Sequence, residues 1–223
     1  MLPERATIPS MIDFEAIIRR LWANAIKCLK SDHIRYDVKA LDALSREDDP
    51  KRRDTIRDWL QDNKVFRVRG VATQRDKIAD AVLRWADSRD PDRNLNGPDA
   101  LNEAHKELMM FVCDAYIDGS QNRRREFTSL TSKALWLCYP DKIPIFDSYT
   151  QRALWVLAKL EIGIAARPSG ANYYQFVSVW TQFYERYLDT ISGLDADGYQ
   201  YRVRVFDRIL WMIGKDQYTF PTK

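Results

Sequence analysis

Apolar side chains recur at three- and four-residue intervals in nearly every segment between chain breakers, which is the spacing of one face of an α-helix. In the first such segment, residues 12–30, Phe14, Ile18 and Trp22 share one stripe, and Ser10 is the expected N-cap. Similar patterns predict helices over residues 34–44, 50–63, 74–86, 98–117, 125–138, 148–160, 173–191 and 201–213. Residues 65–72 (VFRVRGVA) are the candidate for a short extended piece. The pattern predicts an all-α fold of about nine helices.

The segments between the predicted helices are short, and none has the composition of a flexible linker. DRNLNGP near residue 95, DGSQN near residue 120, ARPSG near residue 168 and SGLDADG near residue 195 are turn or loop sequences. No internal repeat or low-complexity tract occurs in the 223 residues. We therefore expect a single compact unit, in which any two lobes would share the chain in an interleaved way.

Composition argues against several classes of protein. No run of about 18 uncharged apolar residues occurs, and the N-terminus lacks the basic and apolar regions of a secretory signal. Cys28, Cys113 and Cys138 are odd in number and widely spaced, which favours reduced, buried thiols over a disulfide framework. With only His33 and His105 besides, no zinc or iron–sulfur ligand set can be assembled. We expect a cytoplasmic protein with no membrane partner and no metal cluster.

The formal net charge of +3 is small, but the basic residues are unevenly placed. Between Gly119 and Leu160 the chain has seven basic and three acidic residues. Ordinary solvated helix faces would give a similar local excess, so the charge alone leaves nucleic-acid binding open.

The stretch YPDKIPIFDSYTQR, residues 139–152, interrupts the helical pattern. Pro140 ends one predicted helix, and Pro144 favours an extended connection up to Asp147, here called the strap (residues 139–147). Asp147 stands where the next helix begins, so its side chain is either an N-cap or a group directed at a substrate. The partial positive charge at a helix N-terminus favours an ionised carboxylate, which makes the two roles compatible in position.

Residues 126–160 resemble the helix-hairpin-helix DNA glycosylase superfamily, which contains endonuclease III and the adenine glycosylase that acts on mismatches. Members of this superfamily have an apolar helix, then a strap of the form phenylalanine or valine, proline, isoleucine or valine, any residue, aspartate. A helix whose first turn leads to an arginine follows. The matching residues here are Ile143, Pro144, Ile145, Phe146, Asp147 and Arg152.

The resemblance implies a bilobal all-α fold with a cleft near residues 120–160 and Asp147 at its mouth. On this basis we expect a monomeric, monofunctional DNA glycosylase that flips a damaged or modified base out of double-stranded DNA and hydrolyses its N-glycosidic bond. No metal or organic cofactor is implied. Cleavage develops oxocarbenium character on the sugar, and a fixed carboxylate stabilises that charge or activates water. Asp147 is therefore the expected catalytic residue.

The chain departs from the superfamily at the hairpin that binds a DNA phosphate. Members carry a Leu-Pro-Gly-x-Gly hairpin with open backbone amides, whereas residues 127–132 here read FTSLTS and contain no glycine. Phosphate contact is therefore expected to shift to hydroxyl groups, to the helix N-terminus and to the neighbouring arginines. The residues expected to bind DNA are Arg123, Arg124, Arg125, Ser129, Thr131, Ser132 and Arg152.

Lys133 is the second catalytic candidate. In bifunctional members, a lysine of the hairpin region attacks the sugar as a Schiff-base nucleophile, which requires a neutral amine. The interval from Lys133 to Asp147 is about one helical turn shorter than in endonuclease III. Lys133 is therefore a candidate nucleophile, a candidate phosphate contact, or an ordinary solvated helix residue.

Aromatic residues near the strap are candidates for the base pocket, with Tyr149 the first choice and Phe146 beside it. Near the C-terminus, Arg204 and Arg208 flank Asp207 at helical neighbour distances. We interpret Asp207 as part of a surface ion-pair cluster and not as a second catalytic acid.

Other functions stay open beside a DNA glycosylase acting in repair or in defence against modified phage DNA. One is a non-catalytic helical module that binds DNA or protein on the same scaffold. Loss of the glycine hairpin separates these two, because a protein that depends on phosphate contact alone should keep its anchor. A further alternative is an all-α protein unrelated to nucleic acid, since the charge signal is mild.

Overall fold

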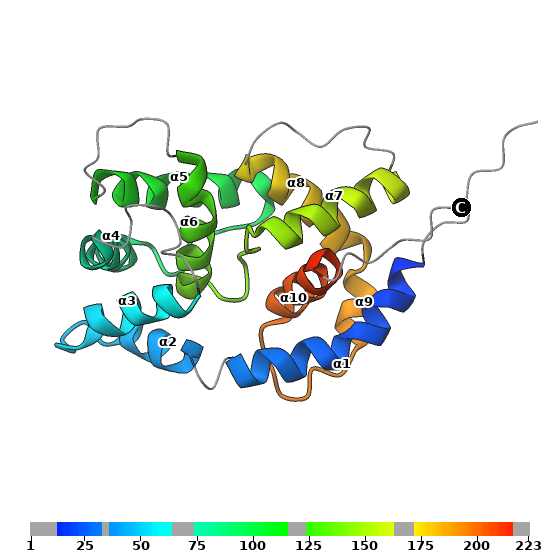
Figure 1. Cartoon of the computed structure of the whole chain (residues 1–223), viewed down its shortest axis with the longest axis horizontal. Coiled ribbons are helices and arrows are strands. Elements are labelled where there is room, and N and C mark those ends of the chain that lie inside the picture. Colours follow the sequence, from blue (N-terminus) through cyan, green and yellow to red (C-terminus); the bar gives the residue numbers. More distant parts are fainter. Residues whose placement is uncertain (1–12, 33–35, 64–73, 116–123, 163–171, 216–223) are drawn as a thin grey trace, which may run out of the picture.

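The structure is a computed structural model that describes residues 13–32, 36–63, 74–115, 124–162 and 172–215. These residues form ten α-helices and no strand (Figure 1). The helices are α1 (Phe14–Asp32), α2 (Val38–Ser45), α3 (Arg52–Asp62), α4 (Arg75–Ser88), α5 (Gly97–Ala115), α6 (Arg124–Cys138), α7 (Ser148–Ile162), α8 (Tyr173–Arg186), α9 (Leu188–Gly193) and α10 (Arg202–Lys215). The predicted all-α class is confirmed. Ser10 and the candidate extended piece at residues 65–72 lie outside the described residues.

The apolar stripe of the first predicted helix is buried as its spacing indicates. Phe14, Ile18 and Trp22 of α1 are each at most 3% exposed. The first turn of α1 is capped by Asp13, whose Oδ1 accepts the backbone N–H of Ala16 at 2.9 Å. Asp13 therefore supplies the cap that the sequence analysis assigned to Ser10.

The predicted helix over residues 173–191 is two helices in the structure. α8 ends at Arg186, Tyr187 has a non-helical φ of −107° and ψ of 13°, and α9 starts at Leu188. The Tyr187 ring packs edge-on against Phe14 of α1, with ring centroids 5.1 Å apart, and its hydroxyl donates to Glu161 of α7. Because these tertiary contacts keep Tyr187 packed against the interior, the apolar pattern continues through the residue at which the helix is interrupted.

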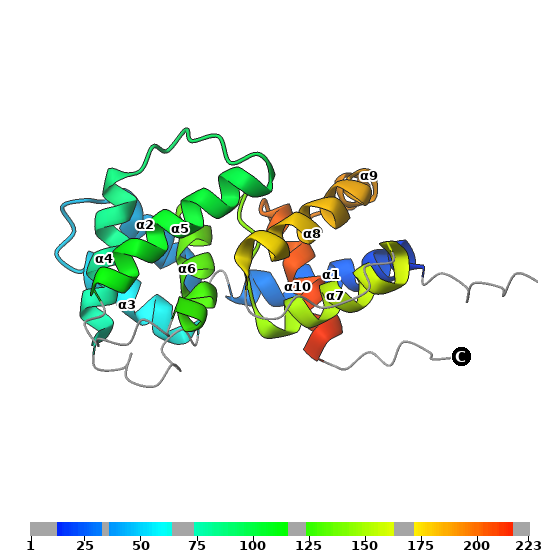
Figure 2. The ribbon, with the colours of Figure 1, turned by 90° about the horizontal axis from the view of Figure 1, so that it is seen from above.

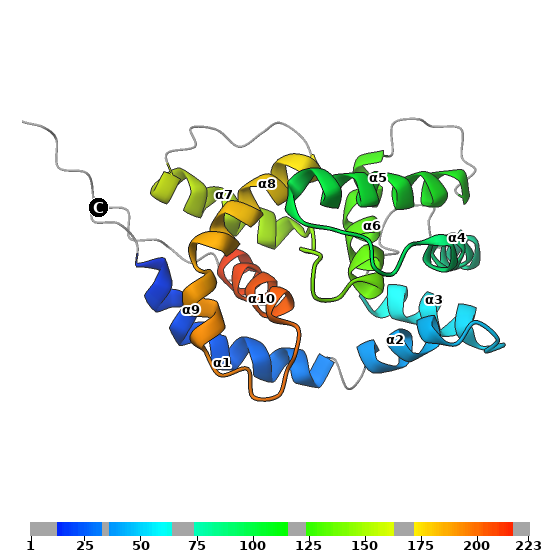
Figure 3. The same ribbon diagram turned by 180° about the vertical axis from the view of Figure 1, so that it is seen from behind.

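The helices form two groups (Figure 2). One group is α2–α6, in which α2 packs on α3, α3 on α4, α4 on α5, and α6 on both α2 and α5. The other group is α1 with α7–α10, in which α10 packs on both α7 and α1. α5 reaches across to α8, and the strap also runs from one group to the other (Figure 3). The chain thus leaves the second group after α1 and returns to it at α7.

Aromatic residues fill the interior of both groups. In the second group, Phe14 contacts Phe183 and Phe206 edge-on, with centroids 6.1 and 6.3 Å apart. In the first group, Trp59 of α3 stacks on the fully buried Trp136 of α6. Trp136 also meets Tyr201 and the Arg204 guanidinium of the other group, so the interior is continuous across the two groups.

The three cysteines differ in exposure. Cys138 is buried, Cys113 is half-buried and Cys28 is exposed, so the expectation of buried thiols is confirmed for Cys138 and wrong for Cys28. No helix among those described combines the length and the apolar composition that a bilayer crossing requires.

Candidate active site between the two helical groups

A cleft of about 560 Å³ lies where the two groups of helices meet. Its walls come from the C-terminal end of α3, from α6, from the strap, from the first turn of α7 and from α10. Four residues that the sequence analysis nominated line it together: Asp147, Lys133, Ser129 and Tyr149. The cleft is therefore the candidate functional site.

Asp147 caps α7 and lines the cleft at the same time. Its Oδ1 accepts the backbone N–H of Tyr149 at 2.8 Å, and its carbonyl accepts the N–H of Gln151, also at 2.8 Å. Among the described residues no donor reaches Oδ2. The cap thus occupies one carboxylate oxygen and leaves the other for a ligand in the cleft, where Asp147 is half-buried.

The strap that carries Asp147 is fixed by hydrogen bonds from three helices. Ser132 Oγ of α6 accepts the Phe146 N–H at 3.0 Å. Asp207 Oδ2 of α10 accepts the Ile145 N–H at 2.7 Å, and the Tyr173 hydroxyl of α8 donates to the Pro144 carbonyl at 3.1 Å. Extended backbone between helices needs such partners, and here they hold the strap on both sides.

Ser132 and Thr131 are both fully buried, which corrects their expected role as phosphate contacts. Ser132 Oγ also donates to the Ser129 carbonyl at 3.1 Å, so its hydrogen bonds serve the packing of α6 against the strap. Ser129, which lines the cleft, is the one of the three hydroxyl residues placed to meet a ligand there.

Phe146 does not open into the cleft, which corrects its expected role in the base pocket. Its ring is 7% exposed and packs edge-on against Phe176 of α8, with centroids 5.2 Å apart. Tyr149 keeps its place: it lines the cleft, and its ring meets that of Trp211 edge-on at 5.7 Å. Tyr149 and Trp211 form the aromatic side of the cleft.

Lys133 projects from α6 across the cleft to α3. Its Nζ donates to the backbone carbonyl of Asn63 at 2.9 Å, just beyond the last residue of α3. Basic side chains stabilise the orphan carbonyls at a helix C-terminus, so Lys133 joins two walls of the cleft. This contact is a fourth role for Lys133 beside the three that the sequence left open.

The α10 wall is basic. Arg204, Arg208 and Lys215 line the cleft from this helix, and Trp211 stands between them. Arg208 is paired with Asp32 of α1, and its guanidinium lies 5.2 Å from the Trp211 ring centroid. The Arg204 side chain meets no carboxylate within ion-pair distance in the described part of the chain, and its buried Nε lacks a hydrogen-bond acceptor there. Arg204 is thus a cation available to an anionic ligand.

Asp207 is buried, which corrects its interpretation as a surface ion-pair residue. It is 2% exposed, and its Oδ1 accepts the Nε1–H of Trp180 at 2.8 Å while Oδ2 accepts from Ile145. Burial, with a smaller contribution from the Asp147 charge, raises the pKa of Asp207 to about 7, although the two hydrogen bonds and the Arg204 charge act in the opposite direction. Asp207 also lines the cleft, beside Ile145 of the strap.

The remaining predicted DNA contacts lie at the edge of the cleft or beyond the described residues. Arg152 is exposed on α7; its guanidinium is 5.7 Å from the Tyr149 ring centroid, and its Nη1 donates to the Gly214 carbonyl at 3.4 Å. Arg123 lies outside the described residues. Arg124 and Arg125 begin α6, and only their backbone is described.

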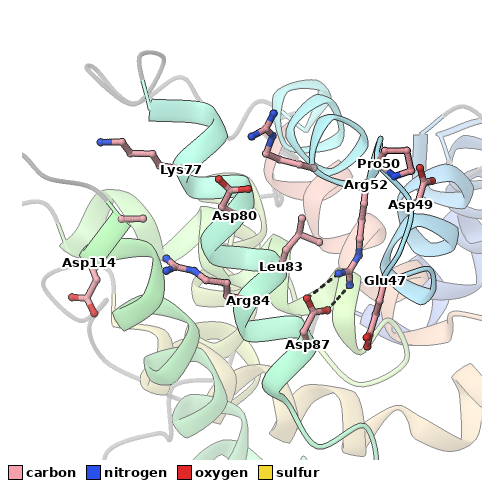
Figure 4. A pocket seen from close by; sticks show the side chains of 12 residues that line it. Glu47, Asp49, Pro50, Arg52, Lys77, Asp80, Leu83, Arg84, Asp87 and Asp114 are labelled. Carbon is pink, nitrogen blue, oxygen red and sulfur yellow. Dashed lines mark hydrogen bonds and ion pairs between the residues drawn. The ribbon is translucent and has the colours of Figure 1, made fainter.

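A second hollow, of about 810 Å³, lies beside α3 and α4 and holds none of the predicted site residues. Its lining mixes both signs of charge, with Lys77 and Arg84 near Asp80 (Figure 4). Arg52 closes one side through two hydrogen bonds to Asp87, of 2.8 and 2.5 Å, and its Nε and Nη2 also donate to carbonyls at the end of α2 (Figure 4). These contacts are structural, so the hollow is the weaker candidate.

In chemical terms, the first cleft brings a half-buried carboxylate, unpaired and paired cations and an aromatic side into one site. The cations suit a polyanion, the aromatic side suits a planar group, and the carboxylate suits a developing positive charge. In the described part of the chain, no group of three or more His, Cys, Asp or Glu side chains is arranged to hold a metal ion.

Sequence reasoning missed Arg204, Arg208 and Lys215 as site residues. They lie on α10, more than 50 residues after Asp147 in the chain. The available signal was the spacing of Arg204, Arg208, Trp211 and Lys215 at four-, three- and four-residue intervals, which places them on one face of the helix. Comparisons of the chain with protein-family models, with curated proteins and with solved structures gave no match.

Proposed function

We propose that this protein is a DNA glycosylase that hydrolyses the N-glycosidic bond of a flipped, damaged or modified base in double-stranded DNA. The observation that carries the proposal is the position of Asp147: its carboxylate caps α7, keeps one oxygen unbound by protein donors, and faces a cleft that also contains cations and aromatic rings. The resemblance of residues 126–160 to the helix-hairpin-helix DNA glycosylases supports the same function.

The reaction assigns one role to Asp147. The bond between C1′ of deoxyribose and the base nitrogen breaks, and its electron pair leaves with the base, which takes up a proton. Water forms the new C1′–O bond and gives up a proton to Asp147 or to solvent. The carboxylate stabilises the oxocarbenium-like sugar: at about 4 Å and an effective dielectric near 20, this interaction is worth roughly 4 kcal/mol. That stabilisation acts in the transition state, where it raises the rate.

The cations have a separate role in this proposal. Arg204, Lys215 and Lys133 line the cleft beside Asp147, and phosphate groups on either side of a flipped nucleotide need such partners. Lys133 is assigned to binding and not to attack on the sugar, because its Nζ donates to the Asn63 carbonyl on the opposite wall. The proposed enzyme is therefore monofunctional.

The alternative is a non-catalytic DNA-binding module on the same scaffold. The hydrogen bond from Tyr149 to Asp147 favours it, since a helix cap alone accounts for an aspartate at this position. In that case the cations would carry the function and the carboxylate would serve only the fold.

The Asp147→Asn variant separates the two functions. Asparagine caps helices about as well as aspartate, so the variant keeps the start of α7 and removes only the charge. Wild type and variant are incubated with DNA carrying normal, alkylated, oxidised and phage-modified bases. Released bases are measured by mass spectrometry and abasic sites by aldehyde labelling. The matched control is Asp141→Asn, which neutralises an exposed carboxylate of the same strap outside the cleft.

A base released by wild type and by Asp141→Asn, and lost by a factor of 100 or more in Asp147→Asn, is the expected result. Borohydride treatment during the reaction should trap no covalent protein–DNA adduct, as a monofunctional enzyme requires. Equal DNA binding by all three proteins with no base released from any substrate would contradict the glycosylase and support the binding module.

A further inference from the structure

Asp207 stands out among the buried polar groups because it contacts the strap that carries Asp147 and has no part in the reaction described so far. Its Oδ2 accepts the Ile145 N–H at 2.7 Å, two residues before Asp147, and its Oδ1 accepts the Trp180 Nε1–H at 2.8 Å. One carboxyl group thereby joins α10, α8 and the strap.

We propose that Asp207 is a positioning residue for Asp147, and that its ionised form fixes the strap while its protonated form releases it. This inference rests on the proposed glycosylase for its activity, but its structural part concerns only the Ile145 amide and can be measured without a substrate.

The hydrogen-bond geometry identifies the ionised state as the one that fixes the strap. Both carboxyl oxygens face an N–H donor, and an ionised carboxylate accepts at both oxygens. A protonated carboxyl keeps one carbonyl acceptor, but its hydroxyl oxygen is a much poorer acceptor than a carboxylate oxygen, so one of the two hydrogen bonds is weakened. Hydrogen bonds to an ionised acceptor are also stronger than those to a neutral one.

The groups around Asp207 place this change near neutral pH. Burial and the Asp147 charge raise the pKa of Asp207, while Arg204, one turn earlier on α10, lowers it, and the result is about 7. From α8, Tyr173 and Tyr184 also face this carboxyl; burial, and to a smaller extent the Asp207 charge, raises the pKa of both phenols, which therefore stay neutral in this range. Asp147 and Arg204 are the charged neighbours that shift the pKa of Asp207, Asp147 upward and Arg204 downward.

Two variants distinguish positioning from simple packing. Asp207→Asn keeps the shape but has one acceptor oxygen, so it cannot accept from both donors and cannot ionise. Trp180→Phe removes the indole N–H that donates to Asp207 Oδ1 and keeps an ionisable Asp207 bound to the Ile145 N–H. Because the Trp180 hydrogen bond lowers the pKa of Asp207, its loss raises that pKa. A merely structural role predicts similar behaviour for both variants.

The experiment records base release and Ile145 amide protection, corrected for intrinsic exchange, from pH 5.5 to 8.5 in the three full-length proteins. We expect kcat/KM and protection of the wild type to rise together with an inflection near pH 7. Trp180→Phe should move both inflections to higher pH. Asp207→Asn should show neither inflection, and its kcat/KM at pH 8 should be about 100-fold below wild type, as expected for a displaced catalytic group.

An unchanged inflection in Asp207→Asn, or Ile145 protection that does not vary with pH in the wild type, would overturn the proposal. If the wild type releases no base from any DNA, the proposed glycosylase fails, and the Ile145 protection profiles still decide the role of Asp207. If Asp207→Asn does not fold, the carboxyl carbon-13 titration of Asp207 in the wild type replaces it. That titration must coincide with the change in Ile145 protection, and a mismatch overturns the proposal.

Discussion

At the scale of single residues, the proposed function gives Asp147 two roles, one for each carboxylate oxygen. Oδ1 accepts the Tyr149 N–H and completes the start of α7, and among the described residues Oδ2 has no donor. A cap needs only an acceptor, whereas stabilisation of a cationic transition state needs the negative charge. The two functions therefore respond differently to substitution.

Replacing Asp147 by alanine or asparagine should show this difference. Asp147→Ala removes the acceptor, so we expect the free energy of unfolding to fall by about 1 kcal/mol, as for other lost N-caps. Asp147→Asn keeps an acceptor and should change stability by only a few tenths of a kcal/mol. Urea denaturation of both variants measures this, and equal destabilisation by the two would mean that the charge, and not the cap, stabilises α7.

At the scale of helices, the placement of the cleft depends on how closely α10 approaches α7. A Cβ atom on Gly214 of α10 would lie 2.0 Å from the Tyr149 carbonyl oxygen and 2.6 Å from its carbonyl carbon. These are backbone atoms in the first turn of α7, so the neighbour cannot rotate away. Glycine at this position sets the distance between the helix that carries Trp211 and the helix that Asp147 caps.

Gly214→Ala should therefore force α10 and α7 apart. We expect a loss of about 3 kcal/mol in the free energy of unfolding, at the upper end of the usual range for overpacking. Gly193→Ala is the matched control, because no atom lies within 4 Å of the added Cβ on α9, and it should stabilise the protein by up to about 1 kcal/mol. Similar thermal unfolding of Gly214→Ala and wild type would contradict the close approach.

Helix positions follow from the sequence because their causes are local. The period of apolar residues located all the segments that form helices here, and α7 begins at the residue after Asp147, as the strap indicates. The break at Tyr187 was not predictable, since it depends on contacts with Phe14 and Glu161 in distant helices. Periodicity identifies an apolar face but does not say which other face it meets.

The candidate site was predictable in part for the same reason. Asp147 and Lys133 stand in a local motif, and both line the cleft. Phe146 of the strap and Ser132 of α6 belong to the same motif but are buried, because Phe146 packs on Phe176 of α8 and Ser132 binds the strap, and these partners are not given by the local sequence. Asp207 looked solvated beside two arginines, and only the packing of α8 and α10 against the strap shows that it is buried.

At the scale of the whole molecule, His105 joins the two groups of helices. It is 2% exposed on α5, stacks on Tyr173 of α8 with ring centroids 3.9 Å apart, and lies 3.2 Å from the Thr128 carbonyl of α6 through Nε2. Burial lowers the pKa of His105 to about 4. Between about pH 4 and pH 7, the folded protein therefore favours a neutral imidazole at His105 and a protonated carboxyl at Asp207.

The His105 imidazole and the Asp207 carboxyl should give opposite dependences of stability on pH. His105 binds a proton more readily in the unfolded chain, so its contribution to stability falls as the pH drops from about 6.5 to about 4. Asp207 binds a proton more readily in the folded chain, so its contribution grows as the pH drops from about 7 towards 3.8. Each effect is on the order of 3 kcal/mol.

We expect His105→Gln to gain stability relative to wild type as the pH is lowered from 7 to 4. Asp207→Asn should lose stability relative to wild type over the same range. Chemical denaturation at several pH values measures the two differences, and the wild type should show the flatter dependence. A difference from wild type that stays constant with pH in either variant would show that the corresponding group does not change its pKa on folding.

DNA binding by the whole molecule should depend on the cleft and its rim. If Arg152 contacts a phosphate beside Tyr149, Arg152→Ala weakens DNA binding and lowers the slope of log K against log salt concentration by about 1. Lys39→Ala is the control, because Lys39 is an equally exposed cation on α2 that does not line the cleft. Fluorescence anisotropy with a labelled duplex at several salt concentrations measures both slopes, and equal slopes for the two variants would remove Arg152 from the interface.

The position of α1 has a consequence for synthesis of the chain. α1 packs on α9 and α10, its Trp22 indole donates to the Asp195 carbonyl at 2.7 Å, and Phe14 packs on Phe183 and Phe206. All of these partners leave the ribosome after α2–α6, which can pack on one another earlier. The apolar face of α1 therefore stays without its packing partners while most of the chain is translated. We expect a chaperone that binds the nascent protein to cover this face.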